Sequence, residues 1–132
     1  MAAIQASNLT RIFAVGEEEV RALDDIDLTL EDGVLAAVVG PSGSGKSTLL
    51  TLLGGLDTPT SGSITVDGGE LSGMSPDELA EYRRTSVGFI FQDFFLLGHL
   101  TALENVEIPM KLAGVPHTEG QARAKELIEL VG

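Results

Sequence analysis

The sequence predicts an α/β fold in which antiparallel β structure opens the chain and a parallel-sheet core with flanking helices follows. Residues 3–13 mix β-forming with polar residues, and apolar and polar residues alternate over 26–31, as in half-buried strands. Residues 34–39 form a short apolar run bounded by glycines, which is typical of a strand buried on both faces. A glycine-rich turn then leads into a helical segment at residues 47–53, which a glycine pair ends.

The turn between that strand and that helix carries a phosphate-binding pattern. Residues 40–48 read GPSGSGKST and fit G-x-x-x-x-G-K-[ST]. Backbone N–H groups of such a turn, together with the positive end of the helix dipole, form an anion site. Lys46 adds a cation for the β- and γ-phosphates, and the Ser47 hydroxyl can coordinate Mg²⁺. A chance match in a surface loop is the alternative, and the flanking strand and helix argue against it. The predicted nucleotide-binding residues of this turn are Gly40, Pro41, Ser42, Gly43, Ser44, Gly45, Lys46, Ser47 and Thr48.

Composition limits the class of protein. The chain has 132 residues, 43% of them hydrophobic, which is enough for one domain with a sizeable core. It has no apolar run of membrane-spanning length and no secretory leader pattern, so we expect a cytoplasmic protein. Cysteine is absent, which excludes disulfides and thiolate metal sites. The net charge of −12, with only eight basic residues, argues against nucleic acid as a partner.

Local signals predict the next elements. The run Gly16, Glu17, Glu18 and Glu19 is expected to be a solvated turn, with an acidic metal cluster as the less favoured interpretation. After the helix at 47–53, a loop over 58–62 leads to a strand over 63–66 and a hairpin turn at 67–68. The residues Ser-Pro-Asp-Glu at 75–78 place a capping serine before a helix that should reach about residue 84.

A second apolar strand is predicted at residues 86–91, and it ends on Gln92. Ligands of open α/β sheets gather at this edge, although a lone glutamine also suits a structural loop. Thr101 and Glu104 have capping-box spacing and should start a helix that Pro109 interrupts. Over residues 118–132, one helical face carries the apolar side chains Ala124, Leu127, Ile128 and Val131.

With the glycine-rich turn and Gln92 in place, the chain resembles the nucleotide-binding subunit of an ABC transporter over nearly its whole length. Residues 9–13 resemble the segment that carries the family's adenine-stacking aromatic, which here is Phe13. Residues 88–92 resemble the Q-loop, whose glutamine contacts Mg²⁺ and the attacking water. Residues 54–57 and 100–106 resemble the lipoprotein-releasing, macrolide-exporting and cell-division-ATPase group. The expected fold is therefore a P-loop NTPase of ABC type.

The resemblance implies ATP and Mg²⁺ as ligands, with Ser47 and Gln92 as metal contacts and Lys46 and Gln92 as catalytic residues. It also implies a membrane permease that is contacted through the Q-loop, a second nucleotide-binding subunit in a homodimer, and a peripheral place on the inner face of the cell membrane. The family's LSGGQ-type signature, Walker B strand and switch histidine are not found in the 132 residues. We therefore expect residues 1–132 to be the N-terminal part of one nucleotide-binding domain, and to be inactive alone.

Two other functions are compatible with these residues. A non-hydrolysing product that binds nucleotide or the permease would act as a regulator. A small kinase would also use a phosphate-binding turn, but Phe13 and Gln92 would then be coincidences.

Overall fold

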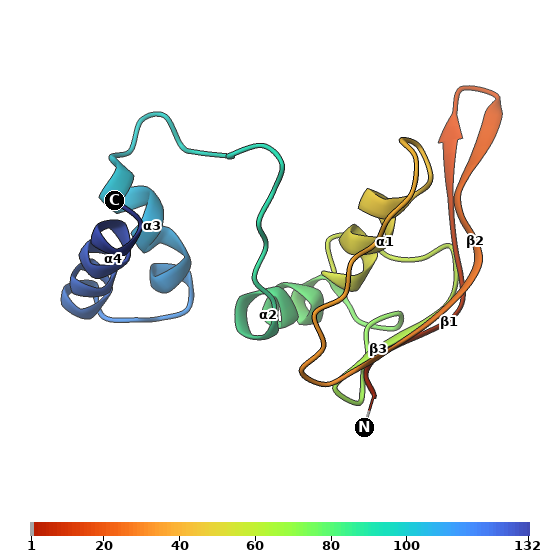
Figure 1. Ribbon diagram of the computed structural model, residues 1–132, viewed down its shortest axis with the longest axis horizontal. Coiled ribbons are helices and arrows are strands. Elements are labelled where there is room, and N and C mark those ends of the chain that lie inside the picture. Colours follow the sequence, from red (N-terminus) through yellow and green to blue (C-terminus); the bar gives the residue numbers. More distant parts are fainter. Residues whose placement is uncertain (1) are drawn as a thin grey trace. The chain divides into compact units, whose positions relative to one another are not determined.

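The computed structural model describes residues 2–132, which divide into two compact units (Figure 1). The N-terminal unit is Met1–Arg83 and the C-terminal unit is Arg84–Gly132, so that the boundary falls in the last turn of a helix.

A four-stranded antiparallel sheet in the order β2-β1-β3-β4 forms the base of the N-terminal unit. Strands β1 (Ala2–Val15) and β2 (Glu18–Glu31) form a long hairpin. Its turn contains Gly16 in the left-handed region, at φ 66°. The predicted solvated turn is therefore confirmed at residues 16–17, whereas Glu18 and Glu19 already belong to β2. Residues 2–132 contain no group of three or more His, Cys, Asp or Glu side chains placed to hold a metal.

The second hairpin joins β3 (Ser61–Val66) to β4 (Gly69–Glu70). Asp67 and Gly68 both have positive φ, at 47° and 81°, which is the backbone of a tight two-residue hairpin turn. The predicted turn at this position is confirmed. Strand β3 also pairs with β1, and this pairing brings residues 61–66 against the start of the chain.

Two helices cover the sheet of the N-terminal unit. Helix α1 (Lys46–Leu53) ends at Gly54, as predicted. Helix α2 (Pro76–Ser86) starts with the predicted capping box: Glu78 N donates to Ser75 Oγ, and Ser75 N donates to the Glu78 carboxylate. The hydrogen bonds from Ser75 lower the pKa of Glu78. The core that the helices share with the sheet consists of Ala6, Leu9, Leu23, Leu49, Leu52, Ile64, Leu71 and Leu79.

Polar contacts from α2 hold the end of α1. Tyr82 Oη donates to Leu53 O at 2.9 Å, and Arg83 Nη1 donates to Gly55 O at 2.6 Å. Burial raises the pKa of the Tyr82 phenol, and the negative charge of Asp67 adds to this effect. Arg83 therefore has a structural role, because it binds a carbonyl that follows α1.

The two strands expected in a parallel core are not strands in this structure. Residues 34–39 have no regular secondary structure; of the predicted strand 86–91, Ser86 ends α2 and residues 87–91 have no regular secondary structure. The side chains of Leu35 and Ile90 are fully exposed. A strand is held by hydrogen bonds to a neighbouring strand, and across residues 2–132 neither segment has one. Both segments have the apolar composition of a core strand, but composition alone does not provide the neighbouring strand with which a strand must pair.

The C-terminal unit contains helices α3 (Ala102–Leu112) and α4 (His117–Val131) (Figure 1). The predicted capping box of Thr101 and Glu104 is present, and its hydrogen bonds lower the pKa of Glu104. The prediction that Pro109 interrupts this helix is wrong, because α3 runs on to Leu112. Pro109 lacks only the one N–H that would bond to the carbonyl of Asn105, and its own carbonyl accepts from Ala113 N at 3.0 Å, so the helix continues past the proline.

The packing of α3 on α4 is only partly apolar. Of the predicted apolar face of α4, Ala124 is buried and Leu127 and Ile128 are half-buried, but Val131 is exposed. The carboxylate of Glu107 on α3 is also buried, and its residue is only 2% exposed. Its Oε2 lies 3.0 Å from Lys111 Nζ and 3.9 Å from His117 Nδ1, whereas Oε1 has no hydrogen-bond partner in residues 2–132.

No helix among the described residues combines the length and the apolar character needed to cross a bilayer.

Candidate functional site

The glycine-rich turn ends in an open helix N-terminus. Gly43 and Gly45 adopt φ of 80° and 93°, which side chains disfavour, and Ser44 N donates to Pro41 O at 3.2 Å to close the turn. Gly45 is the N-cap of α1, and no side chain in the described part of the chain caps this end. The first turn of α1 also has no acidic residue. Its free N–H groups and the helix dipole can therefore bind an anion.

Lys46 folds back over this turn. Its Nζ donates to Gly40 O and Pro41 O, both at 2.7 Å, and lies 3.2 Å from Ser44 Oγ. The ammonium thus sits among acceptors of the turn itself and is only half-buried. An anion bound by the turn would lie beside this charge.

Strand β2 holds the turn from one side. The register between β1 and β2 shifts between Arg11 and Ile12, which leaves Ala22 without a partner on β1. A Cβ on Gly45 would overlap the carbonyl oxygen of Ala22 and would come within 3.0 Å of Leu23 Cδ2. Glycine is therefore required at residue 45 both by φ and by the close approach of β2. Figure 1 shows the turn beside the β1–β2 hairpin, at the start of α1.

Ser47 and Thr48 follow Lys46 in the first turn of α1. Ser47 is exposed, and its carbonyl oxygen accepts a hydrogen bond from Thr51 Oγ1 at 2.7 Å. A hydroxyl is the type of hard oxygen ligand that Mg²⁺ accepts, and the other ligands of such an ion usually come from phosphate and water. The residues present therefore fit a magnesium ion that arrives together with a phosphate ligand.

Phe13 lies on β1 in the same unit as the turn, and it is 37% exposed. The guanidinium carbon of Arg11 lies 4.3 Å from the centroid of the Phe13 ring, and Arg11 Nε donates to Asp57 Oδ2 at 2.7 Å. Sequence reasoning missed Arg11 and Asp57. The spacing of residues 11 and 13 on a strand could have indicated a shared face, but nothing local indicates the contact with Asp57, 46 residues away.

Gln92 belongs to the C-terminal unit, so the structure places the predicted site residues in two units: Phe13 and residues 40–48 in one, and Gln92 in the other. It is exposed and follows an apolar segment in which the rings of Phe89 and Phe91 stack at 5.2 Å. Phe91 also meets the edge of Phe95 at 5.0 Å.

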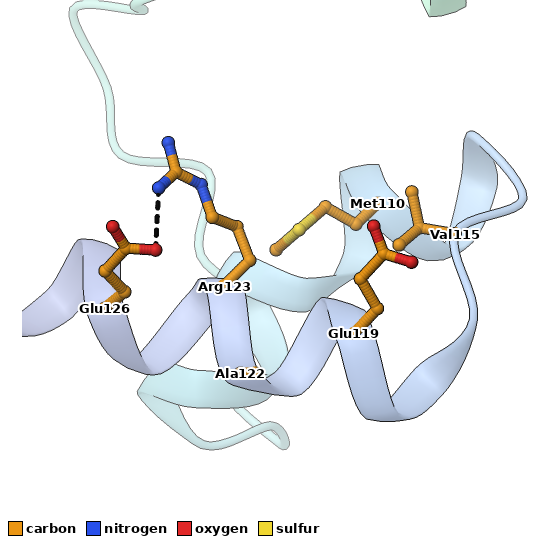
Figure 2. Close-up of a pocket in the computed structure, with 6 residues that line it drawn as sticks. All are labelled: Met110, Val115, Glu119, Ala122, Arg123 and Glu126. Carbon is orange, nitrogen blue, oxygen red and sulfur yellow. Dashed lines mark hydrogen bonds and ion pairs between the residues drawn. The ribbon is translucent and has the colours of Figure 1, made fainter.

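A pocket lies on the C-terminal unit between α3 and α4, as Figure 2 shows. The guanidinium of Arg123 at its rim is paired with Glu126 at 2.8 Å. None of the site residues predicted from the sequence lines this pocket, so we take the glycine-rich turn as the candidate site. The lining residues are Met110, Val115, Glu119, Ala122, Arg123 and Glu126.

Curated relatives cover almost all of this chain. It is 50% identical over 131 residues to the macrolide export ATP-binding/permease protein MacB of Salmonella paratyphi A, which is 99% of this chain and 20% of that protein. It is 51% identical over 122 residues to an uncharacterized ABC transporter ATP-binding protein of Thermotoga maritima, which is 92% of this chain and 52% of that protein. The chain thus spans between a fifth and about half of the length of these relatives.

A solved structure confirms the predicted fold class. The ATP-binding cassette MJ0796, in a dimeric post-hydrolysis state bound to ADP and Pi, matches with a TM-score of 0.90 and 39% identity over 96% of this chain and 56% of that one. The family model for ABC transporters matches residues 23–132, which include the glycine-rich turn, α1 and Gln92. The resemblance seen in the sequence is therefore confirmed, and the chain belongs to the ABC transporter family.

Proposed function

We propose that residues 1–132 form the N-terminal part of an ABC transporter nucleotide-binding domain and that residues 40–48 bind the phosphates of Mg-ATP. The observation that carries this proposal is the open N-terminus of α1, with the Lys46 ammonium folded over the turn that precedes it. In this site Phe13 stacks on adenine. Ser47 and Gln92 are the proposed magnesium contacts, and Mg²⁺ when bound neutralises charge on the β- and γ-phosphates.

Lys46 gains its strongest contacts only when a phosphate is present. In the structure its Nζ donates to two neutral carbonyl groups. With ATP bound, the same ammonium would exchange these carbonyls for charged phosphate oxygens, which adds the attraction of opposite charges to bonds that its own charge already strengthens. The contacts of Lys46 with Gly40 and Pro41 keep its charge beside the turn proposed to bind the phosphates.

Hydrolysis needs more than these residues. The attacking water must be oriented and must lose a proton. Gln92 can orient a water, but an amide cannot accept its proton at neutral pH. We therefore propose that the complete domain is an ATPase and that the 132 residues bind Mg-ATP without turnover. A second nucleotide-binding subunit would close the site from the other side.

In the transporter, ATP binding and hydrolysis would drive a membrane permease through the segment around Gln92. The domain would then lie on the cytoplasmic face of the membrane, as a peripheral subunit or as part of a fused permease. We propose an exporter or lipoprotein-releasing type, and the macrolide export name of one relative supports the exporter.

The experiment is an equilibrium titration of the purified chain with a fluorescent ATP analogue in the presence of Mg²⁺. Replacing Lys46 by alanine should weaken binding about tenfold or more, because charge-assisted hydrogen bonds are lost. Lys125→Ala removes the same charge from an exposed position of α4 and should bind as the parent does. Equal affinity of the parent and the Lys46→Ala variant would rule out the proposed site.

A phosphate-release assay tests the second half of the proposal. The 132-residue chain should release phosphate from Mg-ATP no faster than its Lys46→Ala variant, which reports contaminating ATPases. Turnover that depends on Lys46 would show that catalysis needs fewer groups than proposed here.

A further inference from the structure

The ring of Phe13 is covered on one face by a cation. Residues 11 and 13 lie on the same face of β1, because side chains of a strand alternate. The guanidinium carbon of Arg11 lies over the ring, 4.3 Å from its centroid, within the range of a favourable cation–π contact. Phe13 is still 37% exposed as a residue, so it is not fully covered and can be reached by a second planar group.

The position of Arg11 is itself fixed. Its Nε donates to Asp57 Oδ2 at 2.7 Å, and its Nη1 donates to the carbonyl of Ile12 at 3.2 Å. The side chains of Arg11 and Asp57 are only 23% and 29% exposed, so water competes less for this pair than on an open surface. The other carboxylate oxygen of Asp57 accepts from Thr58 N at 2.8 Å, so both oxygens are engaged.

The segment that carries Asp57 is attached to β1 by the backbone as well. Thr60 N donates to Thr10 O at 2.8 Å, and Ile12 N donates to Thr60 Oγ1 at 2.9 Å. This segment follows α1, the helix whose first turn belongs to the phosphate site. Arg11 and Asp57, which hold the Phe13 ring, therefore belong to the same packed unit as the phosphate-binding turn.

We propose that Arg11, held by Asp57, is a positioning residue that fixes the Phe13 ring for stacking on the base of the nucleotide. This inference rests on the proposed function of residues 40–48. A ring fixed before the ligand arrives loses little side-chain entropy on binding, so more of the stacking energy appears as affinity. The role concerns the base, because Arg11 contacts the Phe13 ring, Asp57 and Ile12, all of which lie outside residues 40–48.

The test compares two ligands in isothermal titrations of the full chain: Mg-ATP, which has a base, and Mg-tripolyphosphate, which has none. Arg11→Ala should lower the affinity for Mg-ATP about three- to tenfold and leave that for Mg-tripolyphosphate unchanged. Asp57→Asn keeps a hydrogen-bond acceptor but loses the charge, and it should give a smaller effect of the same kind. Arg21→Ala is the matched control, because Arg21 pairs with Asp24 on the surface at 3.0 Å.

A double-variant cycle shows whether Arg11 acts through the ring. In a Phe13→Ala background, Arg11→Ala should have no further effect on Mg-ATP affinity. Three results would each overturn the proposal. Arg11→Ala could bind Mg-ATP as tightly as the parent, it could lose the same affinity for Mg-ATP and Mg-tripolyphosphate, or it could lower the Mg-ATP affinity by the same factor when Phe13 is alanine. Failure of the proposed function looks different, because the parent chain would then show no Lys46-dependent binding of either ligand.

Discussion

The ring of Phe13 differs from that of tyrosine by one hydroxyl group. If the ring acts by stacking, Phe13→Tyr should be nearly neutral, whereas Phe13→Ala should cost about 1–3 kcal/mol of ATP binding energy, by analogy with bases stacked on aromatic side chains. The measurement is the affinity for Mg-ATP in the same titrations. Equal binding by all three chains would make Phe13 an ordinary half-exposed strand residue.

Gly45 is the residue at which the turn and β2 come closest. Alanine there must adopt φ of 93° and place its Cβ against the carbonyl oxygen of Ala22, so Gly45→Ala should lower stability by roughly 2 kcal/mol or more. Gly73→Ala is the control, because nothing lies within 4 Å of its added Cβ, and its effect should stay within about 0.5 kcal/mol. Thermal unfolding followed by circular dichroism checks both, and equal midpoints would show that the turn can move away from β2.

Single residues with local partners were predicted well from the sequence. Ser75 and Glu78, like Thr101 and Glu104, form capping boxes because each pair needs only a three-residue spacing. The contact of Arg11 with Asp57 was not predictable in this way, since it depends on how the chain returns after α1.

At the scale of elements, the difference between partners that are near and partners that are far in the sequence explains which predictions failed. Helices α1 to α4 and the two hairpins were predicted because helix and turn signals lie within a few residues of one another. Residues 34–39 and 86–91 have the composition of core strands, yet pairing decides whether an apolar run becomes a strand. The glycine-rich turn and the start of α1 were predicted because one short motif sets both, whereas the role of residues 40–48 in binding a nucleotide stays a prediction.

Helix α3 depends on its capping box, and this dependence should vary with pH. Thr101→Ala should cost about 1 kcal/mol at neutral pH. The pKa of Glu104 is lower in the folded chain than in the unfolded chain, so the unfolded chain binds more protons. The contribution of Glu104 to the free energy of unfolding is therefore present above pH 4.5 and is lost as the pH falls through the lowered pKa. The cost of Thr101→Ala should therefore shrink in acid.

Urea unfolding of the parent and the variant, followed by circular dichroism at about pH 6 and about pH 3.5, measures this difference above and below the ordinary pKa of a glutamate. Thr118→Ala, at an exposed position of α4, should show the same small effect at both pH values. A cost of Thr101→Ala that does not change with pH would mean that the Glu104 carboxylate adds nothing to the cap.

At the scale of the whole molecule, the chain consists of two units whose boundary lies within α2, and a segment without regular secondary structure follows that helix. Between α2 and α3, Phe94 and Phe95 are 90% and 69% exposed. Limited chymotrypsin digestion should therefore cut first within residues 87–98, because a protease needs backbone that is not already held in helices or strands. Mass spectrometry of the early fragments identifies the site, and a first cut at Phe13 would show that β1 opens more readily than this segment.

The buried carboxylate of Glu107 predicts how substitutions at two positions should be linked among relatives. Lys111 is 48% exposed, so its ammonium can turn to water if the glutamate is lost. If Lys111 is lost instead, the buried carboxylate of Glu107 cannot reach water, and an unpaired buried charge is far more costly than an exposed one. Covariation of positions 107 and 111 should therefore be one-sided: glutamate at 107 should occur with a cation at 111, whereas a cation at 111 should tolerate many residues at 107.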